Sequence, residues 1–261
     1  MKLYKRQDAI LRMVKSRGAC SIVELAEMLE VSDETIRRNI RPLIEKNLLD
    51  KVHGGVVLPE NADHEQPFMR RMMSNAAAKE TIAELTAGLI ADGDSLMMDT
   101  GSTTAITARF LRGHKALTVV TNCTEIARIL ATQPENRVYM AGGELRLDDP
   151  AIFGTSAITF VRQFNVKYAI LSIAAISLQG EFMDHHMVQA EFSRAIIGQA
   201  QKTIVVADHT KFNTRTFVKV CSLQDVDILV CDQPPPDALL ARLEQSDVKI
   251  VLPDAQARNQ V

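Results

Sequence analysis

Ser95-Leu-Met-Met-Asp-Thr-Gly-Ser-Thr-Thr104 is the stretch of this chain that decides its fold. Its first four residues predict a buried strand, and residues 105–111 after it predict a helix. Glycine and small hydroxyl residues between a strand and a helix make a tight turn whose N–H groups point outward, beside the positive end of the helix dipole. The stretch therefore predicts an anion site, with a plain helix cap by Ser102 or Thr103 as the alternative.

Short apolar runs alternate with segments of helical length through the rest of the chain. After 95–98 these runs are 118–120, 137–140, 168–173, 203–207, 227–231 and 248–252. Strands that alternate with helices predict a largely parallel sheet covered by helices on both faces. We expect this α/β domain over residues 76–261.

Small and charged residues follow several of these strands or flank a predicted helix. Ligands of open α/β sheets bind beyond the carboxyl ends of the strands, so these residues are expected to meet there. A phosphate would contact the turn and a lysine, and carboxylates would bind hydroxyl groups. The candidates are Asp99, Thr100, Gly101, Ser102, Thr103, Thr104, Thr121, Asn122, Gly142, Gly143, Asp184, Glu191, Asp208 and Lys211. Helix capping at 121–122 and a simple chain turn at 142–143 are the alternatives.

The N-terminal residues predict a second, smaller domain. A helix is expected over 5–16, a second helix begins at the capping-box pattern Ser21–Glu24, and a third covers 33–40. Pro42 is expected to break or kink this third helix. Residues 48–57 predict a small hairpin, or wing. Two short helices joined by a tight turn, the second one charged, are typical of a helix-turn-helix.

The third helix has the side chains that reading DNA requires. Arginine pairs with guanine and asparagine with adenine, although an arginine can also bind phosphate. The expected DNA contacts are Ser32, Thr35, Arg37, Arg38, Asn39, Arg41, Lys51 and His53. A solvated charged face is the alternative, but a capped helix, a turn and a second cap in succession favour DNA.

Charge and composition agree with two domains. Residues 1–58 contain 11 lysines and arginines against 8 acidic residues, and the remaining residues contain 19 against 24. A basic head on an acidic body fits a DNA-binding head, although so small a difference also arises by chance. Residues 59–75, with Pro59 and Pro67, are the expected linker.

Several classes of protein are excluded by the sequence. The four cysteines have neither CxxC nor metal-ligand spacing, so we expect no metal and a reducing compartment. The first ten residues are charged where a signal peptide is apolar, and no apolar run has the length of a membrane span, so we expect a cytoplasmic protein. No GxGxxG follows the first strand, which excludes a nicotinamide dehydrogenase, and no cofactor is expected.

These motifs resemble one known family. The run Val31–Ile40, followed by Leu43, Leu48 and Val52–Val56, resembles the N-terminal signature of DeoR-type repressors. The sensor domain of that family is similar to the stretches Asp99–Thr104, Thr121-Asn122, Gly142–Leu145, Phe153-Gly154 and Asp208–Phe212. The chain departs from the usual family residues at Asn39, Pro42, Lys167 and Ala174-Ala175.

The resemblance implies a fold and a function. The family's sensor domain is similar to ribose-phosphate isomerases and related sugar-phosphate enzymes, which implies a sugar-phosphate or polyol-phosphate effector. Gly142–Arg146 and Asp232–Pro236 look closest to the glycerol-3-phosphate repressor branch. We therefore expect a repressor of a carbohydrate or polyol operon that the effector releases from double-stranded operator DNA. It would act as a homodimer or homotetramer.

Two other functions fit parts of the sequence. One is an isomerase-like enzyme with an accessory DNA-binding domain, in which Asp99, Asp184 or Glu191 would be the base. The other is a scaffold protein without either activity. A helix-turn-helix has no use in metabolic catalysis, so the head favours a regulator over an enzyme.

Overall fold

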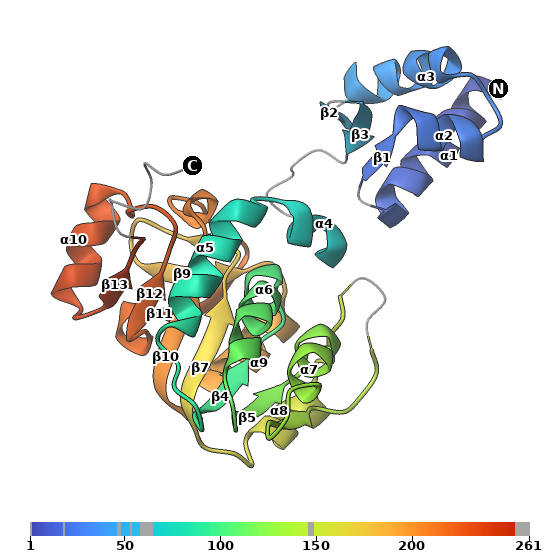
Figure 1. Ribbon diagram of the computed structural model, residues 1–261. Coiled ribbons are helices and arrows are strands. Elements are labelled where there is room, and N and C mark those ends of the chain that lie inside the picture. Colours follow the sequence, from blue (N-terminus) through green and yellow to red (C-terminus); the bar gives the residue numbers. More distant parts are fainter. Residues whose placement is uncertain are drawn as a thin grey trace. The chain divides into compact units, whose positions relative to one another are not determined.

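The chain folds into two compact units, Met1–Arg70 and Arg71–Val261 (Figure 1). The computed structural model describes residues 2–17, 19–45, 48–52, 54–57, 65–145 and 149–253. In this part of the chain no helix combines the length and the apolar character needed to cross a membrane.

The N-terminal unit is a winged helix-turn-helix, as predicted. Its elements are α1 (Lys2–Arg17), β1 (Ala19–Ser21), α2 (Ile22–Met28), α3 (Asp33–Glu45), β2 (Asp50–Val52) and β3 (Gly55–Val57). The three strands form an antiparallel sheet in the order β1-β3-β2, so the predicted hairpin gains a third strand from the segment before α2. Ile10, Leu25, Ile36 and Leu49 are fully buried and form the core with their neighbours.

Both predicted helix starts in this unit are confirmed. The N–H of Glu24 donates to Ser21 Oγ over 3.1 Å, and the N–H of Ser21 donates to Glu24 Oε2 over 2.8 Å, which is a complete capping box. At α3 the N–H of Thr35 donates to Ser32 Oγ over 3.3 Å. These bonds satisfy amides that a helix leaves unpaired at its first turn.

Of the break or kink expected at Pro42, the break is wrong, because α3 continues through Pro42 to Glu45. Ile36, Ile40 and Leu43 lie on one helix face and are each at most 4% exposed in the core of the unit. Burial of this apolar face on both sides of the proline stabilises the helical path, despite the missing N–H.

The second unit contains the predicted parallel sheet. Its strands are β4 (Ser95–Met98), β5 (Thr118–Thr121), β6 (Arg137–Met140), β7 (Val166–Ser172), β10 (Ala200–Val206), β12 (Ile228–Val230) and β13 (Lys249–Val251). They lie in the order β13-β12-β10-β7-β4-β5-β6, with all neighbours parallel. The chain therefore adds strands outward from β4 on one side and from β7 on the other. The point where the direction changes lies between β4 and β7, and ligands bind at such switch points.

Helices cover both faces of this sheet, as expected (Figure 1). Helices α5 (Ala76–Ala87), α6 (Ser102–Phe110) and α7 (Thr124–Ala131) pack in a row on one face. Helices α8 (Thr155–Val161) and α9 (Met187–Ile197) pack together on the other, and α10 (Asp237–Gln245) packs against β13. Short 3₁₀ turns cover Leu111–Gly113, His209–Lys211 and Leu223–Asp225. The expected linker contains the unforeseen helix α4 (Phe68–Met73).

A small antiparallel sheet was not predicted. It contains β8 (Ala175–Ile176), β9 (Glu181–Asp184) and β11 (Val218–Ser222) in the order β11-β9-β8. These strands are two to five residues long and interrupt the strand–helix alternation, so periodicity gave no signal for them. Asp184 consequently ends a strand.

Candidate functional site

Asp99 joins the two strands at the switch point. Both of its carboxylate oxygens lie 3.1 Å from the backbone N of Ser172, and the Ser172 hydroxyl is 3.4 Å from Oδ1. Burial raises the pKa of Asp99 well above its ordinary value, despite these hydrogen bonds, which lower it. Asp99 is 4% exposed, so it fastens β4 to β7, and the expectation that it binds a ligand hydroxyl is not favoured by this geometry.

The turn after β4 places a glycine, which has no side chain to cap with, at the start of α6. Gly101 is the N-cap residue, so the alternative of a cap by Ser102 or Thr103 does not hold, and no cap hydrogen bond from a side chain is found at this helix start among the described residues. A Cβ at Gly101 would lie 1.8 Å from Ser172 Oγ, so only glycine fits this approach. The Thr104 hydroxyl donates to the carbonyls of Asp99 and Gly101 and closes the turn. The amides of this helix start remain suited to an anion.

Two buried oxygen atoms near the turn have no nitrogen or oxygen partner among the described residues. These are Thr100 Oγ1 and Asn122 Oδ1. The amide nitrogen of Asn122 donates to Ile152 O over 2.9 Å, which fixes which atom of the amide is the oxygen. Thr121 is a correction: its hydroxyl donates to Met98 O and accepts from Cys123 N, so it has a structural role.

Three cations lie within electrostatic reach of one another in this unit, and only Lys211 among them was predicted. Lys79 is 4% exposed, and its Nζ donates to the carbonyls of Arg71 and Ser74. The pKa of Lys79 is lowered from 10.5 to about 8, mainly by burial; Asp208 opposes this lowering, and the charges of Lys211 and Arg71 add to it. Lys79 therefore lies within electrostatic reach of two other positive charges and one carboxylate.

Two carboxylates bind residues around these cations. Asp208, at the end of β10, is 1% exposed and accepts from Thr210 N over 3.0 Å and Asn75 Nδ2 over 3.4 Å. Asp149, which was not predicted, accepts from Arg71 Nη2 over 2.9 Å and Gln189 Nε2 over 3.2 Å. The carboxyl edge of the sheet thus contains both acidic and basic side chains.

The remaining predicted residues differ in their surroundings. Asp184 is close enough to raise the pKa of Asp99 by its charge. Gly142 and Gly143 form an exposed turn after β6, where Gly143 has a φ of +149° and a Cβ would lie 2.7 Å from Ile152 Cγ2. Glu191 lies exposed on α9, and its part in the site stays a prediction.

One signal for Lys79 was present in the sequence. Lys79, Ile82, Ala83 and Thr86 have the spacing of one helix face, and all four are buried. A lysine on the apolar face of a helix is costly unless it has a role, because burial disfavours its charge. Arg71 and Asp149 have no comparable sequence signal.

The DNA-reading face predicted on α3 is partly exposed. Arg37, Arg38 and Arg41 are exposed, as is Lys51 on the wing, and Ser32 and Thr35 lie at the start of α3. Asn39 is a correction: it is 2% exposed and its Nδ2 donates to Thr35 O over 2.8 Å. It lies three residues after Ile36 and four before Leu43 on the buried helix face. His53 lies outside the described residues.

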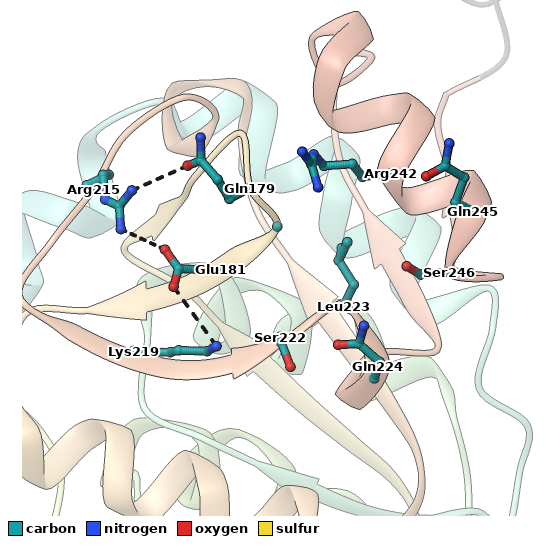
Figure 2. A pocket seen from close by; sticks show the side chains of 11 residues that line it. Gln179, Glu181, Arg215, Lys219, Ser222, Leu223, Gln224, Arg242, Gln245 and Ser246 are labelled. Carbon is teal, nitrogen blue, oxygen red and sulfur yellow. Dashed lines mark hydrogen bonds and ion pairs between the residues drawn. The ribbon is translucent and has the colours of Figure 1, made fainter.

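A hollow of about 530 Å³ lies elsewhere, at the amino ends of β12 and β13 (Figure 2). Arg215 donates to Glu181 over 2.7 Å and to Gln179 over 3.3 Å, and Lys219 Nζ is 4.0 Å from the same carboxylate. Arg242 lines the other side (Figure 2). None of the predicted site residues lines this hollow, so it is separate from the switch point.

The cysteines and the acidic residues give no sign of metal binding. Cys20, Cys123, Cys221 and Cys231 are buried and have free thiols. No group of three or more histidine, cysteine and acidic side chains among the described residues is arranged to hold a metal ion.

Comparison with known proteins places both units in one family. Residues 6–62 match the DeoR-like helix-turn-helix domain, and residues 74–233 match the DeoR C terminal sensor domain. The HTH-type transcriptional repressor CsqR of Escherichia coli (strain K12) is 35% identical over 252 residues, which cover 97% of this chain and 96% of that protein. The glycerol-3-phosphate regulon repressor of Haemophilus influenzae is 34% identical, with 99% and 100% covered.

Solved structures share parts of this fold at low identity. Ribose 5-phosphate isomerase A from Methanocaldococcus jannaschii has a TM-score of 0.38 and 18% identity, covering 53% of this chain and 55% of that one. eIF2B beta from Chaetomium thermophilum has a TM-score of 0.47 and 11% identity, covering 82% and 60%. The two domain matches and the full-length relatives decide the assignment: the chain belongs to the DeoR family of DNA-binding transcriptional regulators.

Proposed function

We propose that this regulator represses an operon for the use of a carbohydrate or polyol and leaves its operator when a phosphorylated sugar or polyol binds between β4 and β7. The observation that carries the proposal is the uncapped start of α6 at Gly101, on the same sheet edge as Lys79, Arg71 and Lys211. A relative of this chain is named for the glycerol-3-phosphate regulon, so a three-carbon polyol phosphate is the first compound to test.

The electrostatics of this edge suit a phosphate. The N-terminus of a helix carries about half a positive charge, and free amides there bind anions. Lys79 donates two hydrogen bonds to neutral carbonyls, so its positive charge lacks a directly bonded carboxylate in the described contacts. A bound phosphate would supply the missing negative charge and favour the protonated form of Lys79.

The head would contact DNA through α3 and the wing. Arg37 and Arg38 would reach base edges or phosphates, and Ser32, Thr35, Arg41 and Lys51 would contact the neighbouring backbone. A helix-turn-helix protein that reads a palindromic site binds as a dimer, so we propose at least a homodimer. Effector binding releases the operator only if the effector prefers the arrangement of heads that does not fit DNA.

The test is a thermal shift of the full chain, followed by DNA binding. Melting temperature is measured with sn-glycerol 3-phosphate, glucose 6-phosphate and fructose 6-phosphate, each paired with its unphosphorylated parent. A ligand at 100 times its Kd stabilises by about 2.7 kcal/mol, which moves the melting temperature by several degrees. A compound that shifts it is then titrated into an operator gel shift. An operator affinity that stays unchanged at saturation would refute release by the effector.

The enzyme alternative gains no support from the relatives. Proteins that match this chain over nearly its whole length are named repressors. The regulator hypothesis also gives both units a use, because ligand binding in one is read out by DNA binding in the other.

A further inference from the structure

Asp149 is a buried carboxylate that accepts hydrogen bonds from residues on helices α4 and α9. It is 6% exposed, and its two oxygens accept from Arg71 Nη2 at 2.9 Å and from Gln189 Nε2 at 3.2 Å. The residue after it, Pro150, accepts from the N–H of Thr124 over 2.7 Å at the start of α7. Asp149 is thereby held against the carboxyl end of β5.

Thr100 Oγ1 and Asn122 Oδ1, the two acceptors described above, belong to segments that surround this carboxylate. Ile152 and Asn122 exchange hydrogen bonds: Ile152 N donates to Asn122 O over 3.0 Å, and Asn122 Nδ2 donates to Ile152 O over 2.9 Å. Burial raises the pKa of the neighbouring Cys123 thiol; Asp149 adds to this rise and the Thr100 hydroxyl opposes it. The Thr100 hydroxyl is therefore within hydrogen-bond reach of this sulfur atom, and Asp149 is within electrostatic reach of it. Asn122 is fully buried and Thr100 is 8% exposed.

We propose that Asp149, Asn122 Oδ1 and Thr100 Oγ1 form a subsite that recognises hydroxyl groups of the effector, and that Arg71 competes with the effector for Asp149. These three residues are named here the acceptor cluster. Each presents a hydrogen-bond acceptor in the protein interior, where an acceptor that lacks a donor is unfavourable. Hydroxyl groups of a polyol or sugar supply donors. A carboxylate in the same place supplies none and is repelled by Asp149, so phosphorylated acids are excluded. The inference rests on the proposed phosphate site at Gly101.

Arg71 connects this subsite to the rest of the chain. It is the first residue of the second unit and lies in α4, directly after the segment that follows the head. Lys79 donates to the carbonyls of Arg71 and Ser74, so the phosphate side of the site contacts the same turn. An effector hydroxyl that takes the place of Arg71 at Asp149 would change the contacts of α4. It would thereby shift the conformational equilibrium of the segment that leads to the head.

The first experiment measures discrimination between alcohols and acids. Binding to the full chain is measured by calorimetry for two matched pairs, sn-glycerol 3-phosphate with 3-phosphoglycerate and glucose 6-phosphate with 6-phosphogluconate, and for inorganic phosphate. The native chain should prefer the alcohol of at least one pair by tenfold or more. Asp149→Asn keeps the shape of the side chain and should reduce that preference to about threefold or less, without changing the affinity for inorganic phosphate.

The outcomes separate the two proposals. If none of the phosphorylated compounds binds, the phosphate site itself is wrong, and this inference falls with it. If they bind but Asp149→Asn leaves the preference for the alcohol intact, only the acceptor cluster is refuted.

The second experiment tests competition by Arg71. Arg71→Gln removes the competitor, so the alcohol probe should bind several-fold more tightly. The effect of that probe on operator affinity should fall toward onefold, from a starting value that is typically 5- to 150-fold in allosteric proteins. Arg242→Gln, which removes an exposed arginine from the hollow in Figure 2, is the matched control and should change neither value.

Weaker binding of the probe to Arg71→Gln, with the effect on operator affinity intact, would overturn the competition. Melting temperature and circular dichroism establish that each variant is folded. If Arg71→Gln does not fold, Arg71→Lys retains the charge with altered geometry and should show the same two changes at smaller size.

Discussion

Replacement of Lys79 by methionine should change how the stability of the protein depends on pH. The pKa of Lys79 is lowered from 10.5 to about 8 in the folded chain, mainly by burial. One pKa unit corresponds to about 1.4 kcal/mol, so holding this side chain protonated in the folded state costs about 3 kcal/mol below pH 8. The side chain is only 4% exposed, so solvent screens this cost little.

The sign follows from proton linkage. Between pH 8 and 10.5 the unfolded chain binds a proton on Lys79 that the folded chain has lost, and stability rises with pH wherever the unfolded state binds more protons. Relative to Lys79→Met, the native chain should therefore gain about 1.4 kcal/mol between pH 7 and pH 9. The other groups that titrate in this range are common to both proteins, and they cancel in the comparison.

Urea unfolding at pH 7 and pH 9, in buffers without phosphate, measures this difference. Lys202→Met is the control, because Lys202 is exposed on β10 and should leave the pH dependence unchanged. Saturating effector should reduce the gain, since a bound phosphate favours the protonated lysine. Equal pH dependence in the native chain and in Lys79→Met would refute the buried, charge-bearing position given to this lysine.

Three further changes test other parts of the structure. Arg37→Ala or Arg38→Ala should weaken operator binding and lower the slope of log affinity against log salt by about one for each phosphate that the variant no longer binds; unaltered binding and slope in both variants would contradict the position of the reading helix. Gly101→Ala should lower stability by about 1–3 kcal/mol, because the new Cβ would lie 1.8 Å from a side-chain oxygen; Gly113→Ala, where no atom lies within 4 Å, is the control in a thermal melt. Asn39→Ala should leave the preferred operator sequence unchanged in a competition assay, because the side chain faces inward, and a changed base preference would show that it reaches DNA.

The parts of the fold that could be predicted are those that local pattern determines. Short apolar runs located all seven parallel strands. In β4, β5 and β12 this is because a strand buried on both faces has no polar alternation to obscure it. The capping box at Ser21 located α2 because its two hydrogen bonds join residues only three positions apart in the sequence. Pro42 shows the limit of local rules: its ring disfavours a helix, but burial of Ile40 and Leu43 on either side of it keeps α3 continuous.

The candidate site was predicted where it depends on backbone and missed where it depends on contacts between distant segments. Gly101 could be identified because a strand, a tight turn and a helix are contiguous in the sequence. Arg71 and Asp149 are 78 residues apart, and neither comes directly after a strand of the parallel sheet, so the strand-end rule could not select them. The proposed anion site thus depends on one short stretch of sequence. The selectivity that we propose for it depends on Asp149 and Arg71, which come into contact only in the folded chain.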